Sequence, residues 1–213
     1  MAKDRRRHLP STAFVLVVVL VLAAFAAIFV YGGFYNIGAD APHSTLVYNA
    51  LQELRERSIE RRSSAIKLPA DLNSPKRIAA GAGLYAEMCT GCHLGPGVER
   101  SELSQGLYPQ APELARGTDL TAAQQFWVIK HGVKLTAMPA WGKTHNDELI
   151  WDMVAFLQQL PKMSPEQYKA AVASAPEDHE EMMKEMSGQR SSADSPKTRT
   201  HPHPAGEGPN AEL

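Results

Sequence analysis

The stretch that decides the fold runs from residue 81 to residue 93 and reads GAGLYAEMCTGCH. It contains both cysteines of the 213-residue chain, Cys89 and Cys92, and His93 directly follows the second. On one helical turn, residues three apart face the same side, with Cβ atoms ~5–6 Å apart. The two thiols and the imidazole are therefore predicted to act together at one place.

The Cys-x-x-Cys-His pattern is typical of covalent attachment of a c-type haem. Two thiols at this spacing can form thioethers with the two vinyl groups on one side of a haem, and His93 then becomes the proximal iron ligand. A thioredoxin-like redox pair needs a βαβ context, and no stretch of this sequence alternates like a strand. A structural zinc site needs two more ligands, usually another cysteine pair, and the sequence has none. The pattern therefore predicts one haem c, bound through Cys89 and Cys92.

The sixth ligand of the iron is predicted downstream, at Met138-Pro139. Methionine and histidine are a known axial pair in c-type haem, and this pair raises the reduction potential. The proline fixes its own φ and stiffens the loop that presents the sulfur. His131 and His145 are the rival ligands, and a methionine is also a common filler of gaps in a core.

The segment around the motif, residues 74–162, is predicted to be a compact and mostly helical domain. Ser74-Pro75 is a helix start, with a cap followed by proline at the first helical position. A capping box at Thr121–Gln124 begins a second helix, which Gly132 ends. A third helix begins within residues 144–147 and stops at Pro161, and its apolar residues form a stripe that faces the core. The predicted fold class is all-α.

The same segment resembles a class I cytochrome c in the order and spacing of several short motifs. Gly81 and Tyr85 precede the cysteines as in that family, and Ala155-Phe156-Leu157 matches the contact that its last helix makes with the glycine. Met138-Pro139-Ala140-Trp141-Gly142 resembles the methionine loop of the family. The resemblance covers residues 74–162 alone.

This resemblance implies roles for further residues. Pro112-Glu113-Leu114 matches the Pro-x-Leu that usually follows the haem motif, so the Pro112 carbonyl is expected to accept a hydrogen bond from Nδ1 of His93 and to orient the ring. Tyr85 is expected beside the haem, and Leu114 and Trp141 are expected in the haem pocket because they stand next to matched motifs.

The N-terminal part is predicted to be a membrane anchor. Residues 13–35 carry no charge, and the run is long enough to cross a hydrocarbon core of ~30 Å as one helix. A cleaved signal peptide is the alternative, because residues 39–41 (Ala-Asp-Ala) mimic a cleavage site, although an apolar region of ~7–15 residues is usual there. The basic residues of segment 1–12 predict a cytoplasmic N-terminus.

The remaining segments connect or follow the compact domain. Residues 36–73 are predicted to be a helical stalk, with a docking helix for a partner as the alternative. In residues 163–187 a helix is predicted to begin at Ser164-Pro165-Glu166 and to reach about Met186. Residues 188–213 are poor in apolar side chains and are predicted to be disordered. The acidic, histidine- and methionine-containing residues 177–186, with His201 and His203, are predicted to be solvated, and copper binding is the alternative because these ligands suit it.

Together these features predict a one-electron carrier on a bacterial inner membrane, with a single pass and a periplasmic haem domain, and they do not predict an enzyme. Membrane-tethered bacterial cytochromes c, which this arrangement resembles, imply an oxidase, a quinol:cytochrome c reductase or a dehydrogenase as redox partners in a respiratory chain. The net charge of −1 gives no indication of nucleic-acid binding. A fixed subunit of an oxidase or dehydrogenase complex, a haem-based gas or redox sensor and a peroxidase are the alternatives.

Overall fold

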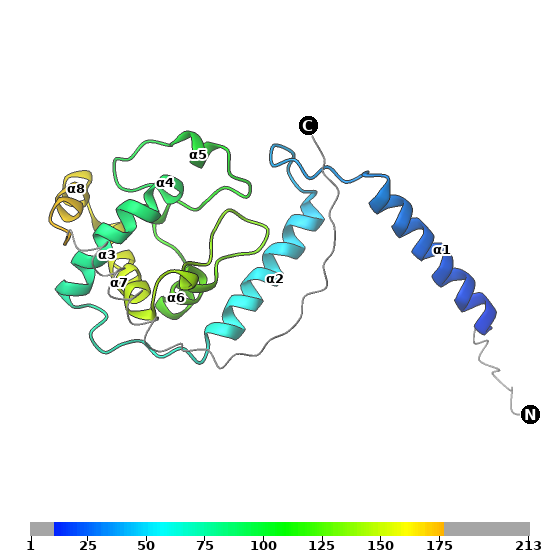
Figure 1. Cartoon of the computed structure of the whole chain (residues 1–213), viewed down its shortest axis with the longest axis horizontal. Coiled ribbons are helices and arrows are strands. Elements are labelled where there is room, and N and C mark those ends of the chain that lie inside the picture. Colours follow the sequence, from blue (N-terminus) through cyan, green and yellow to red (C-terminus); the bar gives the residue numbers. More distant parts are fainter. Residues whose placement is uncertain (1–10, 177–213) are drawn as a thin grey trace, which may run out of the picture.

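The computed structural model describes residues 11–176, which contain helices and no strand, so the predicted all-α class is confirmed for them (Figure 1). The predicted tail and its candidate copper ligands lie outside the described residues, as do residues 1–10. The helices in chain order are α1 (Thr12–Tyr31), α2 (Thr45–Ser63), α3 (Pro75–Met88), α4 (Thr90–His93), α5 (Glu102–Gln105), η1 (Leu114–Arg116), α6 (Ala122–His131), η2 (Trp141–Lys143), α7 (Asp147–Leu157), η3 (Leu160–Lys162) and α8 (Pro165–Ala173).

The helix starts predicted from the sequence are confirmed by their caps. The Ser74 hydroxyl accepts a hydrogen bond from the backbone of Arg77 at the start of α3. At α6 the side chains of Thr121 and Gln124 form a reciprocal capping box, and Gly132 ends the helix with a φ of 64°. Each cap satisfies a backbone group that the helix itself leaves without a partner, so these positions fix where the helices begin and end.

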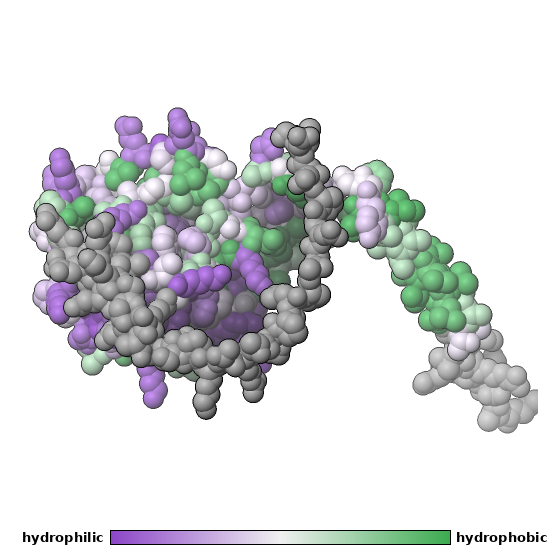
Figure 2. All heavy atoms as spheres, in the orientation of Figure 1, coloured by the Kyte–Doolittle hydropathy of each residue, from purple (hydrophilic) through white to green (hydrophobic). Residues whose placement is uncertain are grey.

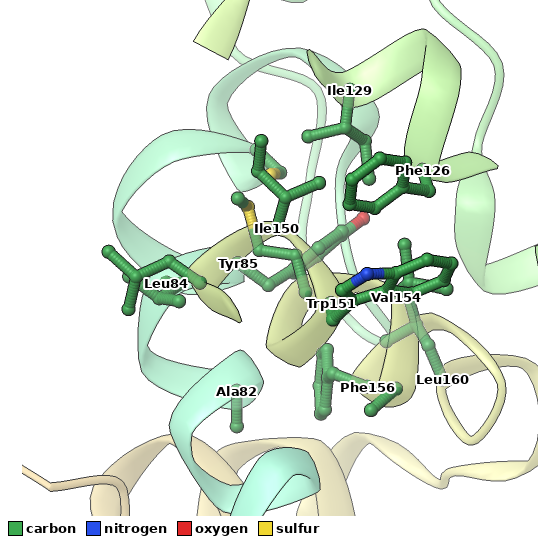
Figure 3. Packing of buried hydrophobic residues seen from close by; sticks show 14 of the residues in the cluster. Ala82, Leu84, Tyr85, Phe126, Ile129, Ile150, Trp151, Val154, Phe156 and Leu160 are labelled. Atoms are coloured by element: carbon green, nitrogen blue, oxygen red, sulfur yellow. The ribbon is translucent and has the colours of Figure 1, made fainter. Parts of the chain in front are cut away.

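The core lies where α3 crosses α7, with α6 packed against the other side of α7 (Figure 3). Gly81 allows this close crossing, because a Cβ atom on it would lie 2.0 Å from the backbone oxygen of Asp152. Next to the crossing, the buried rings of Tyr85 and Phe156 lie 5.5 Å apart. On the α6 side, Phe126 stacks on Trp151 at 4.1 Å between centroids. The crossing thereby fixes the helix that leads into the cysteines.

Arg77 ties the same two helices together one turn before Gly81. Its guanidinium group contacts the carboxylates of Asp152 at 2.8 Å and Glu148 at 2.6 Å, both on α7, and that of Asp71 at 3.0 Å. The Arg77 side chain is only 13% exposed, and a cation at this depth is stable only when it is paired. Three carboxylates provide that pairing.

α8 packs on the outer side of α3, and it is shorter than predicted. Tyr168 buries its ring between α8 and the core, edge-on to Tyr85 at 6.4 Å between centroids. The helix predicted within residues 163–187 ends at Ala173, so its predicted length is wrong. Two residues later Ala175 precedes Pro176, and the residue before a proline is disfavoured in the α conformation.

α1 is an isolated apolar helix whose side chains are exposed along its whole length (Figure 2). It is the one helix in the described part of the chain that is long and apolar enough to cross a membrane. It ends at Tyr31 and not near residue 35, because Gly32 caps it and Gly33 takes a φ of 63°. A residue in this left-handed region does not continue an α-helix.

α2 does not stand as a free stalk, which differs from the prediction for residues 36–73. The helix lies along the compact domain and packs its C-terminal half on α6 (Figure 1). Ile59 and Ser63 are buried there, at 5% and 4% exposure. This packing could not be predicted from the sequence, because the arginines between the apolar residues give α2 an overall polar character.

We expect Gly81→Ala to lower the free energy of unfolding by on the order of 3 kcal/mol, because the new methyl group overlaps the α7 backbone, which cannot move without unpacking the core. Guanidinium denaturation followed by helical circular dichroism measures the loss. Gly106→Ala is the matched control, since its Cβ would meet no atom closer than 3.7 Å. Equal stability of the two variants would contradict the close crossing.

Candidate functional site

Cys89 lies between α3 and α4, and Cys92 lies one turn later within α4. The backbone N–H groups of Cys92 and His93 both donate to the carbonyl of Cys89, at 3.1 and 2.8 Å. Neither cysteine forms a disulfide, and Cys89 is buried while Cys92 is half-buried. Burial raises the pKa of the Cys89 thiol to about 12, with a smaller contribution from Cys92. The structure thus holds two free cysteines on one turn of the chain.

His93 is oriented by one hydrogen bond. Its Nδ1 lies 2.8 Å from the carbonyl oxygen of Pro112, and because a carbonyl only accepts, Nδ1 carries the proton and donates it. Burial lowers the pKa of the imidazole, although the Pro112 carbonyl partly opposes this. The ring is thus held neutral with its Nε2 lone pair available, which is the form of histidine that binds a metal.

The turn that carries the motif is held by side chains from distant parts of the chain. The Thr90 hydroxyl lies 3.1 Å from the carbonyl of Tyr85 and 2.8 Å from the hydroxyl of Tyr168 on α8. On the other side the Ser101 hydroxyl donates to the carbonyl of Gly91 at 2.7 Å. These contacts fix both residues between the cysteines, so the turn is rigid.

Directly after the motif the chain takes a strained conformation. Leu94 has a φ of 60°, and for a leucine a positive φ costs on the order of 1–3 kcal/mol. The hydroxyl of Tyr85 donates to the Leu94 carbonyl at 2.6 Å, and both residues are buried. Burial raises the pKa of the Tyr85 phenol, which keeps it a donor. Tyr85 therefore fixes the backbone directly after the motif.

Met138 lies in a tight loop that returns to the end of α6. The Val133 N–H donates to the carbonyl of Met138 at 3.2 Å, and the Met138 N–H donates to the hydroxyl of Thr136 at 3.1 Å. Gly132 permits this return, because a Cβ atom there would lie 2.7 Å from the Met138 carbonyl oxygen. The Met138 side chain is half-buried against the core.

The two rival histidines occupy different surroundings. His145 is buried, its Nδ1 lies 2.8 Å from the Thr144 hydroxyl, and its ring lies edge-on to Trp141 at 5.4 Å. His131 is exposed at the end of α6 and lies 4.9 Å from the ring of Trp127. Both rings thus rest against tryptophans, one inside the domain and one on its surface.

The structure gathers most of the predicted site residues around one core. Tyr85 and Cys89 belong to the buried cluster, and Leu114, Met138 and Trp141 pack against it half-buried. Three supporting groups were missed from the sequence: Thr136, the Ser101 hydroxyl and the Thr90–Tyr168 pair. Thr90 stands inside the motif and could have been noticed, but its partner is 78 residues away, and no local pattern marks such a contact.

Residues 76–157, less than half of the chain, match the family model described as cytochrome c oxidase, cbb3-type, subunit III. No curated protein matches the chain, and no solved structure matches it. The matched segment begins one residue into α3 and ends with α7, so it includes both cysteines, His93 and Met138. α2 and α8 lie outside it.

The residues present fit the haem c that such a domain implies. The site offers two thiols on one turn, an imidazole whose Nδ1 is already used and whose Nε2 is not, and a thioether on a separate loop. Among the described residues there is no group of three or more histidine, cysteine or carboxylate side chains that could hold a bare metal ion. The donor set therefore suits a macrocycle with two axial ligands better than an isolated metal ion.

We expect Tyr85→Phe to lower the free energy of unfolding by about 1–3 kcal/mol, because it leaves the buried carbonyl of Leu94 without its donor. Guanidinium denaturation followed by tryptophan fluorescence measures the change. Tyr48→Phe, at an exposed tyrosine on α2, is the control and should have almost no effect. If Tyr85→Phe were as stable as the control, the Tyr85–Leu94 bond would not support the motif.

Proposed function

Because residues 76–157 are a c-type cytochrome domain, whose chemistry is haem-based electron transfer, we propose that the chain is a membrane-tethered one-electron carrier with a single haem c. The observation that carries this proposal is the His93–Pro112 hydrogen bond beside two free thiols. It presents an imidazole ready to ligate iron at the place where covalent attachment would hold a haem.

In this proposal Cys89 and Cys92 would form the thioethers, and Nε2 of His93 and the sulfur of Met138 would hold the iron. A haem bound in this way supplies one reversible Fe(III)/Fe(II) couple. Met138 is favoured over the histidines because its loop is closed by defined hydrogen bonds and its side chain faces the core. His131 is exposed on the surface, and His145 contacts Thr144 and Trp141.

The rigidity of both ligand-bearing segments supports electron transfer over catalysis. His93 is fixed through Pro112, and the Met138 loop is closed by Val133 and Thr136. If these segments hold the iron in both oxidation states, few atoms would move during electron transfer. A peroxidase or a gas sensor needs an open or labile sixth position, and this arrangement does not favour one.

The membrane tether is supported by α1 and by the charges around it. α1 is 20 residues long, predominantly apolar and exposed along its length, and the basic residues precede it in the sequence. By the positive-inside rule these charges favour a cytoplasmic N-terminus, and the residues after α1 would then lie in the periplasm, where c-type haem is attached. The redox partners would then be an oxidase, a quinol:cytochrome c reductase or a dehydrogenase of the same membrane.

A second candidate is a fixed cytochrome subunit of an oxidase complex. The description of the matching family, which names an oxidase subunit, favours it. A subunit that is held permanently should co-migrate with a large complex after mild detergent extraction and native electrophoresis. A free carrier should migrate alone, because redox encounters typically bury less than ~1,200 Å² and dissociate readily.

We expect the dithionite-reduced protein to keep its visible spectrum when CO is added, and Met138→Ala to form a CO adduct, because the variant opens the sixth position. Its reduction potential should also fall, since the methionine ligand raises it. Met88→Leu is the control, because Met88 is also half-buried against the core. A wild-type CO adduct would refute the closed site and favour the sensor. A Met138→Ala spectrum without an adduct would assign the ligand to another residue.

We expect the full chain to remain in the membrane pellet after carbonate extraction. A chain in which a cleavable signal peptide replaces residues 1–35 should appear in the soluble periplasmic fraction with the same haem spectrum. The control is a chain that carries the same signal peptide in front of the intact residues 1–35. This control chain should stay in the membrane. Release of the full chain by carbonate would contradict an anchor in α1.

A further inference from the structure

α2 is fastened to the cytochrome domain at both of its ends. Just before its first turn, the backbone N–H of His43 donates to the hydroxyl of Tyr108 at 2.8 Å, and the two rings meet edge-on at 5.3 Å. In its last turns, Ile59 and Ser63 are buried against the domain, where α2 packs on α6. α2 is therefore attached to the domain at two separate places.

The two attachments belong to opposite sides of the haem site. Tyr108 stands in the loop that leads to Pro112, the residue that holds His93. α6 leads through Gly132 into the loop of Met138. A helix attached to both must cross from the histidine side to the methionine side, and Figure 1 shows α2 spanning this flank, away from α3 and α8.

One stripe of α2 faces the domain. Val47, Leu51, Arg55 and Ile59 follow each other at intervals of four residues, and all are half-buried or buried. The adjacent Leu46 and Leu54 are 80% and 66% exposed. Residues four apart lie on the same face of a helix. Arg55 therefore stands on the inward face, one turn from the buried Ile59.

Arg55 differs from the paired arginines of the described chain. Arg57, Arg77, Arg100 and Arg116 each contact at least one carboxylate, whereas no ion pair or hydrogen bond of the Arg55 side chain occurs among the described residues. A half-buried cation is costly unless an anion accompanies it. Arg55 thus presents a half-buried guanidinium group on the inward face of α2, and such a group is suited to an anionic partner.

We propose that Arg55 binds a propionate of the haem, an inference that rests on the proposed function. A c-type haem carries its two thioethers on one edge and its two propionates on the opposite edge. With thioethers at Cys89 and Cys92, the carboxylates would point away from these cysteines, and α2 lies on the flank of the domain away from α3. A guanidinium group suits this partner, because its planar fork matches a carboxylate with two parallel hydrogen bonds.

This pairing would give α2 a part in setting the redox behaviour of the site. A propionate beside the haem is a negative charge that favours ferric iron, and Arg55 would offset it in a partly buried place where salt screens little. Arg55 would also hold the middle of α2 to the domain, between the two attachments at its ends. The helix outside the family match would then be an integral wall of the haem site.

The test compares Arg55→Gln with Arg61→Gln in the haem-loaded full chain in detergent. Arg61 is an exposed arginine on the same helix and has no ion pair among the described residues. We expect Arg55→Gln to lower the midpoint potential and to speed amide hydrogen exchange in residues 45–63. Arg61→Gln should change neither, and Arg55→Lys should restore part of the potential, because it keeps the charge but loses the fork.

Equal potentials for the two glutamine variants would overturn the proposal. Faster exchange in Arg55→Gln with an unchanged potential would also overturn it, because Arg55 would then serve packing alone. The CO test on the same samples separates this result from a failure of the proposed function. A wild-type CO adduct refutes the closed electron carrier, whereas a closed iron with equal potentials refutes only the role of Arg55.

Discussion

The contact between Gly81 and the α7 backbone at Asp152 determines where everything else in the site can be. It sets the distance between α3 and α7, and the rings of Tyr85 and Phe156 fill the space beside it. α3 then delivers Cys89 and, through one more turn, His93. A larger residue at position 81 would therefore displace the Cys-x-x-Cys-His turn itself, because no flexible segment separates the crossing from the cysteines.

Single hydrogen bonds from widely separated segments of the chain hold the turn that follows this helix. Pro112 orients His93, Tyr168 holds Thr90, and Ser101 holds Gly91. Each bond links the motif to a different loop or helix. The Cys-x-x-Cys-His turn is therefore held from several sides, and in the proposed function this would keep the haem ligands in place during repeated changes of oxidation state.

The sequence allowed prediction of those features that depend on local chemistry. The Cys-x-x-Cys-His spacing, the caps at Ser74 and Thr121 and the glycine at position 132 each act within a few residues, and all appear in the structure as expected. The docking of α2 on the domain and the hydrogen bond between Thr90 and Tyr168 could not be predicted, because they join residues that are 65 and 78 positions apart. α8 ends at Ala173, short of the predicted end, because Pro176 disfavours the helical conformation at the residue before it.

The attachment of α2 to the domain also limits how far the domain can travel. With α1 in the membrane as proposed, only residues 32–44 remain as a linker between the two helices, and even fully extended they reach at most about 45 Å. The haem would then stay within a thin layer above the lipid surface. Encounters with partners in the same membrane would become a two-dimensional search at high local concentration, and soluble partners would be at a disadvantage.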